Sequence, residues 1–362
     1  MPAALIKVLI VEDSAVAREL LTRVLLGVPG IVIAGCAKDG AEALAMLAAC
    51  QPDVITMDIH MPGLDGYEVT RQIMETLPVP IIIVSSSYDA DDVTQTFRAM
   101  EAGAVAAVEK PPGPGAPDHE TLARKLTDMV IAMAEVRVVR RWAHARTANR
   151  GVVPAMPRAG ISDAVNDIQI VAIGASTGGP PVLQTILSAL PKPFPAPILS
   201  VQHISAGFVQ GLAEWLTHST GLPVAVAGEG DQVAPGRAYL APDGFHMTIA
   251  KGGRISCIAD KPEVGLRPAV SCLFRSVAAG YGRNAVGILL TGMGRDGADE
   301  LKVMRECGAV TIAQDRESSV VHGMPGAAIQ IGAAVHVLPP ERIAAALRDM
   351  VTLPTPAMDS PR

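Results

Sequence analysis

The sequence predicts an α/β protein of two domains, from its length, its composition and two series of short apolar runs that alternate with amphipathic segments. The 362 residues exceed the length over which one hydrophobic core keeps growing. Apolar residues make up 49% and aromatic residues 3%, a balance typical of alanine- and valine-rich helices packed on parallel strands. The alternation itself predicts parallel sheets covered by helices on both faces.

The first series of elements runs from Ile6 to Lys110. Its predicted strands lie in KVLIVED, IVIAGCA, VITMDI, PIIIVSSS and AVAAVEKP, and helices are expected near residues 15–26, 40–49, 66–76 and 90–102. A further helix, roughly over residues 119–141, would complete a flavodoxin-like, doubly wound domain over residues 1–140.

A second α/β series follows a stretch without periodicity. Residues 141–165 are rich in Arg, Gly and Pro and are expected to form a linker. Strands are then predicted in DIQIVAIG, PILSVQ, PVAVA, AYLA, HMTIA, AVGILLTG, AVTIAQ and AAVHVL, which gives a second domain over residues 166–352 and a frayed, Pro-rich tail over 353–362. Residues 141–165 and the end of the preceding helix carry a basic cluster, which we interpret as a solvated helix end and linker rather than a phosphate-binding patch. The cluster consists of Arg137, Arg140, Arg141, Arg146 and Arg150.

Charge and hydropathy argue against two classes of partner. The formal net charge of −6 gives no attraction toward nucleic acid, so no nucleic-acid partner is expected. The N-terminus lacks the pattern of a signal peptide, and no stretch approaches about 20 consecutive apolar residues. A cytoplasmic protein without membrane insertion is therefore expected. Reduced core thiols are predicted for the five widely spaced cysteines: Cys36, Cys50, Cys257, Cys272 and Cys307.

Polar residues of the first domain fall at the predicted carboxyl ends of strands, where open parallel sheets gather their ligands. Glu12 and Asp13 follow the first strand, Asp58 the third, Ser85 the fourth and Lys110 the fifth. Clustered carboxylates repel one another and favour a hard cation such as Mg²⁺. Asp58 could then attack a phosphoryl group while Lys110 and the Ser85 hydroxyl stabilise its oxygens.

These stretches, VLIVEDS, MDIHMPGLDG, IIIVSSS and VEKPP, resemble the receiver domain of two-component response regulators over about the first 130 residues. The resemblance implies that Asp58 is the phosphoacceptor and that a histidine kinase is the phosphoryl donor. It implies that Glu12 and Asp13, with Asp58 and the main-chain carbonyl of His60, bind Mg²⁺. One departure is Ala107, which stands where many receivers carry an aromatic switch residue, so the usual aromatic route of signal coupling is in doubt.

The second domain carries a serine between a predicted strand and a helix. Ser176 lies in Gly174-Ala-Ser-Thr-Gly178, which satisfies the G-x-S-x-G nucleophile-elbow pattern. A helix cap and a glycine-rich phosphate loop compete with this interpretation. A dinucleotide fold would place an acidic residue at the end of the next strand, but PILSVQHIS offers Gln202 and His203.

An activated serine needs a base and an acid that orients it. His203 and Asp296 both lie just past predicted strand ends, so one cleft could gather them with Ser176. Spacing alone leaves other candidates open for the two roles: His246 and His322 for the base, and Asp231, Asp243 and Asp315 for the acid.

The second half resembles the catalytic domain of the chemotaxis protein-glutamate methylesterases, the CheB family, through IGASTGGP, VQHISAGF, YLAPDGFHM, LRPAVSCLFRSVA, LLTGMGRDGA and AQDRESSVVHGMP. The resemblance implies a Rossmann-like α/β esterase with Ser176 as nucleophile, His203 as general base, Asp296 as orienting acid and the Met293 N–H as an oxyanion donor. No cofactor is expected for this reaction.

The same resemblance implies glutamate methyl esters and glutamines of methyl-accepting chemotaxis receptors as substrates. A receiver packed against the esterase cleft until Asp58 is phosphorylated is the regulatory hypothesis. A signalling scaffold without turnover is the alternative, and the retention of all three triad residues argues against it. A transcription factor would carry a short helix-turn-helix output, whereas this second domain is a long α/β unit.

Overall fold

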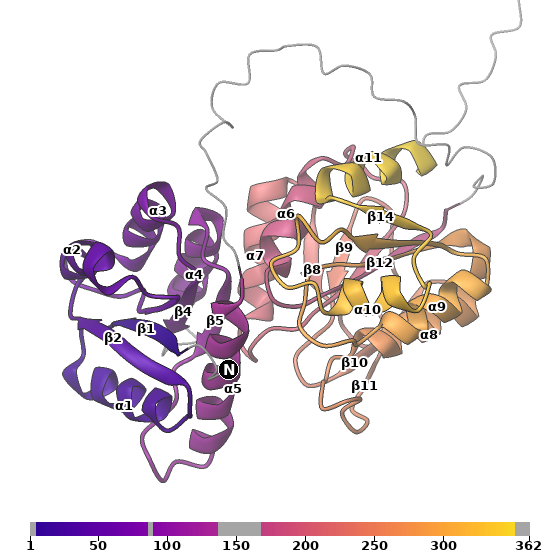
Figure 1. Ribbon diagram of the computed structural model, residues 1–362. Coiled ribbons are helices and arrows are strands. Elements are labelled where there is room, and N and C mark those ends of the chain that lie inside the picture. The colour runs from indigo at the N-terminus through magenta and orange to yellow at the C-terminus, as the bar shows by residue number, and fades with distance from the viewer. Residues whose placement is uncertain (1–4, 86–89, 137–167, 352–362) are drawn as a thin grey trace, which may run out of the picture.

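The computed structural model describes residues 5–85, 90–136 and 168–351, and it contains two α/β domains that lie side by side (Figure 1). The five arginines of the basic cluster and the tail lie outside the described residues. No helix in the described ranges is long and apolar enough to cross a membrane.

The first domain is built on a five-stranded sheet in the order β2-β1-β3-β4-β5, with every pair parallel. This is the flavodoxin-like order expected for the first domain. Its strands have the following bounds: β1 Ile6–Val11, β2 Ile31–Ala37, β3 Val54–Met57, β4 Ile81–Ser85 and β5 Ala106–Glu109. β3 and β4 are buried along their whole length, which explains why their sequences are nearly continuous apolar runs.

Five helices cover this sheet: α1 Ala15–Leu26, α2 Gly40–Cys50, α3 Gly66–Thr76, α4 Ala90–Ala102 and α5 His119–Ala134. The side chains of Ser14, Asp39 and Asp65 cap the first three by accepting a main-chain N–H from the first turn. The expected extent of α5 to residue 141 is wrong, since the helix ends at Ala134. The β-branched valines of the following EVRVVRR segment disfavour helix, and residues 137–141 lie outside the described ranges.

The second domain is built on a seven-stranded sheet in the order β14-β13-β12-β6-β7-β9-β8, again with every pair parallel. The chain starts in the middle at β6, builds one side through β7, β8 and β9, and then returns to build the other side from β12. Its strands are β6 Ile170–Ala175, β7 Ile198–Gln202, β8 Val224–Val226, β9 Ala238–Leu240, β12 Ala285–Leu289, β13 Val310–Gln314 and β14 His336–Leu338.

The remaining elements of the second domain are helices and one hairpin. The helices are α6 Gly179–Ser188, α7 Val209–Thr220, α8 Val270–Tyr281, the 3₁₀ turn η1 Gly282–Asn284, α9 Ala298–Glu306, α10 Met324–Gln330 and α11 Pro340–Val351. The predicted strand HMTIA, β10 His246–Ala250, forms, but it pairs antiparallel with β11 Arg254–Ile258 outside the main sheet. Gly252 and Gly253, both at positive φ, turn the chain between them.

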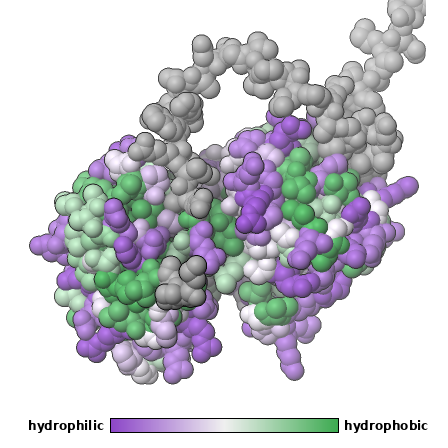
Figure 2. Space-filling model, viewed as in Figure 1, coloured by the Kyte–Doolittle hydropathy of each residue, from purple (hydrophilic) through white to green (hydrophobic). Residues whose placement is uncertain are grey.

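The two domains contact each other through α4 of the first and α6 and α7 of the second. The Phe97 and Trp215 rings stack with centroids 5.4 Å apart. Glu101 Oε1 accepts hydrogen bonds from Trp215 Nε1 at 3.1 Å and Gln184 Nε2 at 2.7 Å. We call Phe97, Glu101, Gln184 and Trp215 the interdomain latch. Figure 2 shows the two domains as lobes in contact.

All five cysteines are free thiols, as expected. The expectation that they lie in the core is wrong for Cys307, which is exposed at the end of α9, and the other four are only half-buried. Burial, together with a hydrogen bond and the charge of Glu263, raises the pKa of Cys272 to about 12.

Candidate active and phosphorylation sites

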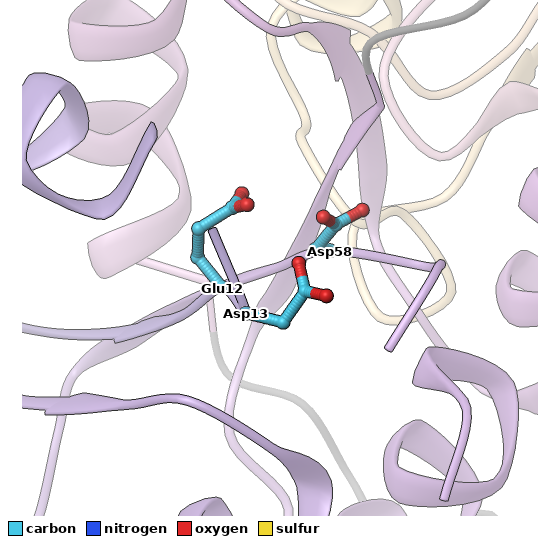
Figure 3. A group of neighbouring side chains, drawn as sticks. All are labelled: Glu12, Asp13 and Asp58. Atoms are coloured by element: carbon cyan, nitrogen blue, oxygen red, sulfur yellow. The ribbon is translucent and has the colours of Figure 1, made fainter. Parts of the chain in front are cut away.

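Three carboxylates gather at the carboxyl edge of the first sheet (Figure 3). Glu12 and Asp13 follow β1 and Asp58 follows β3, and one oxygen of each lies within 4.8 Å of the others. Glu12 and Asp58 are buried, whereas Asp13 is exposed. Oxygen atoms of this kind and number suit Mg²⁺, which favours carboxylates and water. The His60 N–H donates to Asp58 Oδ1 at 3.3 Å, so the His60 main chain lies beside the same carboxylate.

Lys110 neutralises part of this negative charge. Its Nζ lies 2.7 Å from Glu12 Oε2 and 3.0 Å from Asp58 Oδ2. Burial alone would lower the pKa of Lys110, but the hydrogen bond to Glu12 and the charges of Asp58 and Glu12 raise it. Burial also raises the pKa of Glu12. The hydrogen bond from Lys110 lowers this pKa, and the repulsion of Asp58 raises it further. The site therefore holds more negative charge than one ammonium balances, which favours a bound cation.

Ser85 supplies a buried hydroxyl that can donate a hydrogen bond to a phosphoryl group. Its side chain is 2% exposed at the end of β4, and its Oγ has no hydrogen-bond partner among the described residues. A buried hydroxyl without a partner is costly. A phosphoryl oxygen on Asp58 would accept this hydrogen bond, so the residues fit the group that the sequence implied. Ala107, on β5, faces the second domain and lines a pocket shared with it.

The second site begins at the end of β6. Ser176 lies between β6 and α6, and its N–H donates to the Thr291 carbonyl at 3.0 Å. Gly178 follows at φ +78°, and a Cβ there would lie 2.6 Å from Val320. Gly292 passes so close that its Cβ would lie 2.7 Å from Ser176 Cβ. Only glycine fits these two positions, because the turn is tight and the backbone approaches the serine directly.

His203 and Asp296 meet as a hydrogen-bonded pair. His203 follows β7, Asp296 lies in the loop after β12, and His203 Nε2 is 3.0 Å from Asp296 Oδ2. Since β12, β6 and β7 are neighbours in the sheet, the three predicted triad residues come from adjacent strand ends. Ser176 and His203 line one pocket of about 510 Å³, together with Met293.

The main chain of α8 and one side chain hold the Asp296 carboxylate, which is 5% exposed. Oδ1 accepts from Ser271 Oγ at 2.5 Å and the Ser271 N–H at 3.0 Å, and Oδ2 accepts from the Val270 N–H at 2.6 Å. Burial would raise the pKa of Asp296, but the hydrogen bonds from His203, Ser271 and Val270 and the charge of His203 hold it below its usual value. An ionised Asp296 only accepts, so His203 Nε2 carries a proton and Nδ1 is left as the basic nitrogen.

Gln202 joins Ser176 and His203 through their main chains. Its Nε2 donates to the Ser176 carbonyl at 2.7 Å and to the His203 carbonyl at 2.8 Å, and the side chain is 5% exposed. Sequence reasoning missed Gln202, Ser271 and Val270 as parts of the site. No local pattern marks them, because their roles depend on contacts between β6, β7, α8 and the loop after β12.

The other candidates for base and acid have local roles. His246 is buried between the Lys261 carbonyl and the Ala269 N–H, and it lines a different pocket. His322 is half-buried beside Gly326, and its Nε2 has no partner among the described residues. Each remaining aspartate accepts main-chain N–H groups in a loop, Asp231 from Gly228, Asp243 from Gly207 and Asp315 from Ser318.

Comparison with known proteins identifies both halves. Residues 171–347 match the family model of the CheB methylesterase, and residues 8–116 match that of the response regulator receiver domain. A protein-glutamate methylesterase/protein-glutamine glutaminase of Geobacter metallireducens is 54% identical, over 96% of this chain and 99% of the relative. One of the same name from Nitrosospira multiformis is 54% identical, over 96% of this chain and 97% of the relative.

Among solved structures, the catalytic domain of the Thermotoga maritima CheB methylesterase is 39% identical. It covers 51% of this chain and 98% of its own, with a TM-score of 0.49. The family models account for both domains in their observed order, and the two relatives align from one domain to the other. The chain therefore belongs to the CheB family of methylesterases, in which a response regulator receiver domain precedes the esterase.

Proposed function

We propose that Ser176, His203 and Asp296 hydrolyse glutamate methyl esters on methyl-accepting chemotaxis receptors and deamidate receptor glutamines. The observation that carries this proposal is the ionised, fully hydrogen-bonded Asp296 paired with His203 beside the serine of the nucleophile elbow. Such a pair leaves His203 basic on the side that takes the serine proton. The substrate helices of these receptors lie in the cytoplasm, which is therefore the proposed place of action.

The reaction follows from the roles of these groups. Ser176 Oγ attacks the ester carbonyl carbon while His203 accepts the hydroxyl proton, and Asp296 stabilises the resulting imidazolium. The developing oxyanion accepts from the Met293 N–H in this proposal. His203 then protonates the leaving methanol, or ammonia when the substrate is glutamine, and water hydrolyses the acyl-enzyme with His203 again as base.

We propose that Asp58 receives a phosphoryl group from a chemotaxis histidine kinase. Mg²⁺, when bound by Glu12, Asp13, Asp58 and the His60 carbonyl, would neutralise charge on the phosphoryl oxygens. Asp58 supplies the attacking carboxylate oxygen. Lys110 and the Ser85 hydroxyl each donate to a phosphoryl oxygen; the close contact of Lys110 with Asp58 and the unpaired state of Ser85 support these roles.

The docked receiver restricts access to Ser176, and phosphorylation of Asp58 shifts the population toward an undocked arrangement. The shared pocket supports this proposal, because residues of α5 and β5 of the receiver line it together with Ser176. The proposed functional units are the receiver over residues 1–140 and the esterase over 166–352, joined by a linker over 141–165.

Release of methanol from receptor bearing labelled methyl groups tests the proposal. The full-length protein, Ser176→Ala and Asp58→Asn are each incubated with and without Mg²⁺ and a small phosphodonor. We expect release that requires Ser176, and stimulation by phosphodonor that requires Asp58. Release that persists in Ser176→Ala would refute the esterase mechanism, and stimulation that persists in Asp58→Asn would refute the phosphorylation site. No release from a cognate receptor would favour the scaffold alternative.

A further inference from the structure

The pocket between the domains reaches the nucleophile while the receiver is docked. It has a volume of about 510 Å³, and both Ser176 and His203 lie on its wall. Ser176 is half-buried rather than sealed. The receiver contributes Met100, Ala107 and Met129, among others, to the lining of the same pocket. Docking of the receiver therefore covers the esterase face without filling the space in front of the serine.

The size of this space separates two classes of substrate. Pockets of 300–1,000 Å³ hold drug-sized molecules, so 510 Å³ admits a small ester. One turn of α-helix with its side chains, about 10–12 Å across and 5.4 Å long, fills about 500 Å³. A receptor helix continues beyond that turn in both directions, so it needs more room beside Ser176 than the 510 Å³ left by the docked receiver.

Ala107 leaves this space open. It stands on β5 where many receivers carry an aromatic side chain, and it contributes only a Cβ to the pocket wall. A phenylalanine at this position would add a ring that buries about 150–250 Å² of surface, which would occupy the space beside the active site. The interdomain latch lies on α4, α6 and α7. None of the four latch residues lines the pocket, so a small molecule can occupy it while the latch stays closed.

We infer that the unphosphorylated, docked protein hydrolyses small neutral esters at Ser176, and that Ala107 sets the size limit of this activity. The inference rests on the proposed function, since it uses the same nucleophile. Ser176 Oγ bonds to the acyl carbon and the alcohol leaves with the proton that His203 took from the serine. Water then cleaves the acyl-enzyme, so ester and water give acid and alcohol. Receptor demethylation depends on undocking, whereas small-ester hydrolysis does not.

The test uses the full-length protein with p-nitrophenyl acetate, read as p-nitrophenolate release, beside receptor bearing labelled methyl groups, read as methanol release. Without phosphodonor, we expect turnover of the acetate ester that phosphodonor changes by less than about twofold, and little methanol release from receptor until phosphodonor is added. Ala107→Phe should lower acetate turnover at least fivefold without phosphodonor and recover it with phosphodonor. This recovery also shows that the variant is folded. The matched control is Ala41→Phe, at an exposed position of α2.

The outcomes separate this inference from the proposed function. If Ser176→Ala hydrolyses the acetate ester as fast as the parent protein, the nucleophile assignment fails. If Ser176 is required but the parent protein is inactive toward acetate until phosphodonor is added, only the inference fails. It also fails if Ala107→Phe has no effect, or if this variant raises both small-ester and receptor turnover, because the ring would then open the interface instead of filling the pocket.

Discussion

Gln202 is a positioning residue, since it touches neither proton donor nor acceptor of the proposed reaction. Its amide bridges the carbonyls of Ser176 and His203 inside the protein. Replacement by leucine keeps the approximate volume and leaves both carbonyls without this donor. The Ser176 carbonyl still accepts from the Gly179 N–H, whereas loss of the donor to the His203 carbonyl costs about 1–3 kcal/mol. The spacing of the two residues should therefore loosen.

We therefore expect Gln202→Leu to lower kcat for methyl-ester hydrolysis by about tenfold or more with a smaller change in KM, and to lower Tm. Gln210→Leu, at an exposed position of α7, serves as the control. Steady-state kinetics and thermal unfolding of both variants check this. An unchanged kcat in a destabilised Gln202→Leu variant would show a purely structural role.

Asp296 should make the free energy of unfolding of the esterase domain decrease at low pH. Its pKa in the folded protein lies below the ordinary aspartate value of 3.8 because donors from His203, Ser271 and Val270 outweigh the effect of burial. A group with a lowered folded pKa stabilises the fold above its unfolded pKa, and this contribution is lost as pH falls through the folded value. Unfolding in the parent protein should therefore become easier as pH drops below about 4.

Asp296→Asn should unfold more readily at neutral pH, and its free energy of unfolding should fall less steeply below pH 4. Urea unfolding at several pH values, compared between the two proteins, measures the difference. Parallel pH profiles would mean that Asp296 contributes no proton-linked stability.

At the scale of elements, the latch is a stacked and hydrogen-bonded contact between the receiver and the esterase domain. Glu101 on α4 accepts from Trp215 on α7 and from Gln184 on α6, so one carboxylate joins three helices. Glu101→Ala removes both hydrogen bonds and leaves the Phe97–Trp215 stack. Hydrogen bonds to a charged acceptor contribute about 1.5–3 kcal/mol each when protected, and less here because Glu101 is exposed.

We expect Glu101→Ala to raise receptor demethylation without phosphodonor several-fold and to leave the fully phosphorylated rate unchanged. Glu75→Ala, which removes an exposed carboxylate of α3, is the matched control. The ratio of the two rates is the quantity to measure. A Glu101→Ala protein with the parent ratio would show that the latch does not hold the inhibited state.

Most helices and strands could be predicted from the sequence. The spacing of apolar residues and the polar residues that follow each strand are local features of the chain. The five helices of the receiver follow from such patterns, and so does the position of Ser176 between β6 and α6. The β10–β11 hairpin was missed as a separate unit because only the Gly252-Gly253 turn distinguishes it from another strand of the series. The choice of Asp296 over Asp315 depends on the packing of α8 against the β12 end, which spacing does not encode.

At the scale of the whole molecule, the two domains share one functional surface. The regulatory hypothesis predicts that a chain beginning near residue 163 lacks the receiver wall of the pocket and demethylates receptor faster than the unphosphorylated full-length protein. Methanol release at equal concentrations checks this, with circular dichroism to confirm that the shortened chain is folded. A folded fragment no faster than the full-length chain would contradict inhibition by the receiver.

The order of the seven-stranded sheet has a consequence for synthesis of the chain. Ser176 and His203 belong to the side built first, through β6 and β7, whereas Asp296 arrives only after β12 has been added on the other side of β6. A growing chain that stops before β12 holds a serine and a histidine but no carboxylate to orient them. In the proposed mechanism, efficient ester hydrolysis thus begins only when both halves of the sheet have joined, so an unfinished chain would demethylate a receptor far more slowly than the finished one.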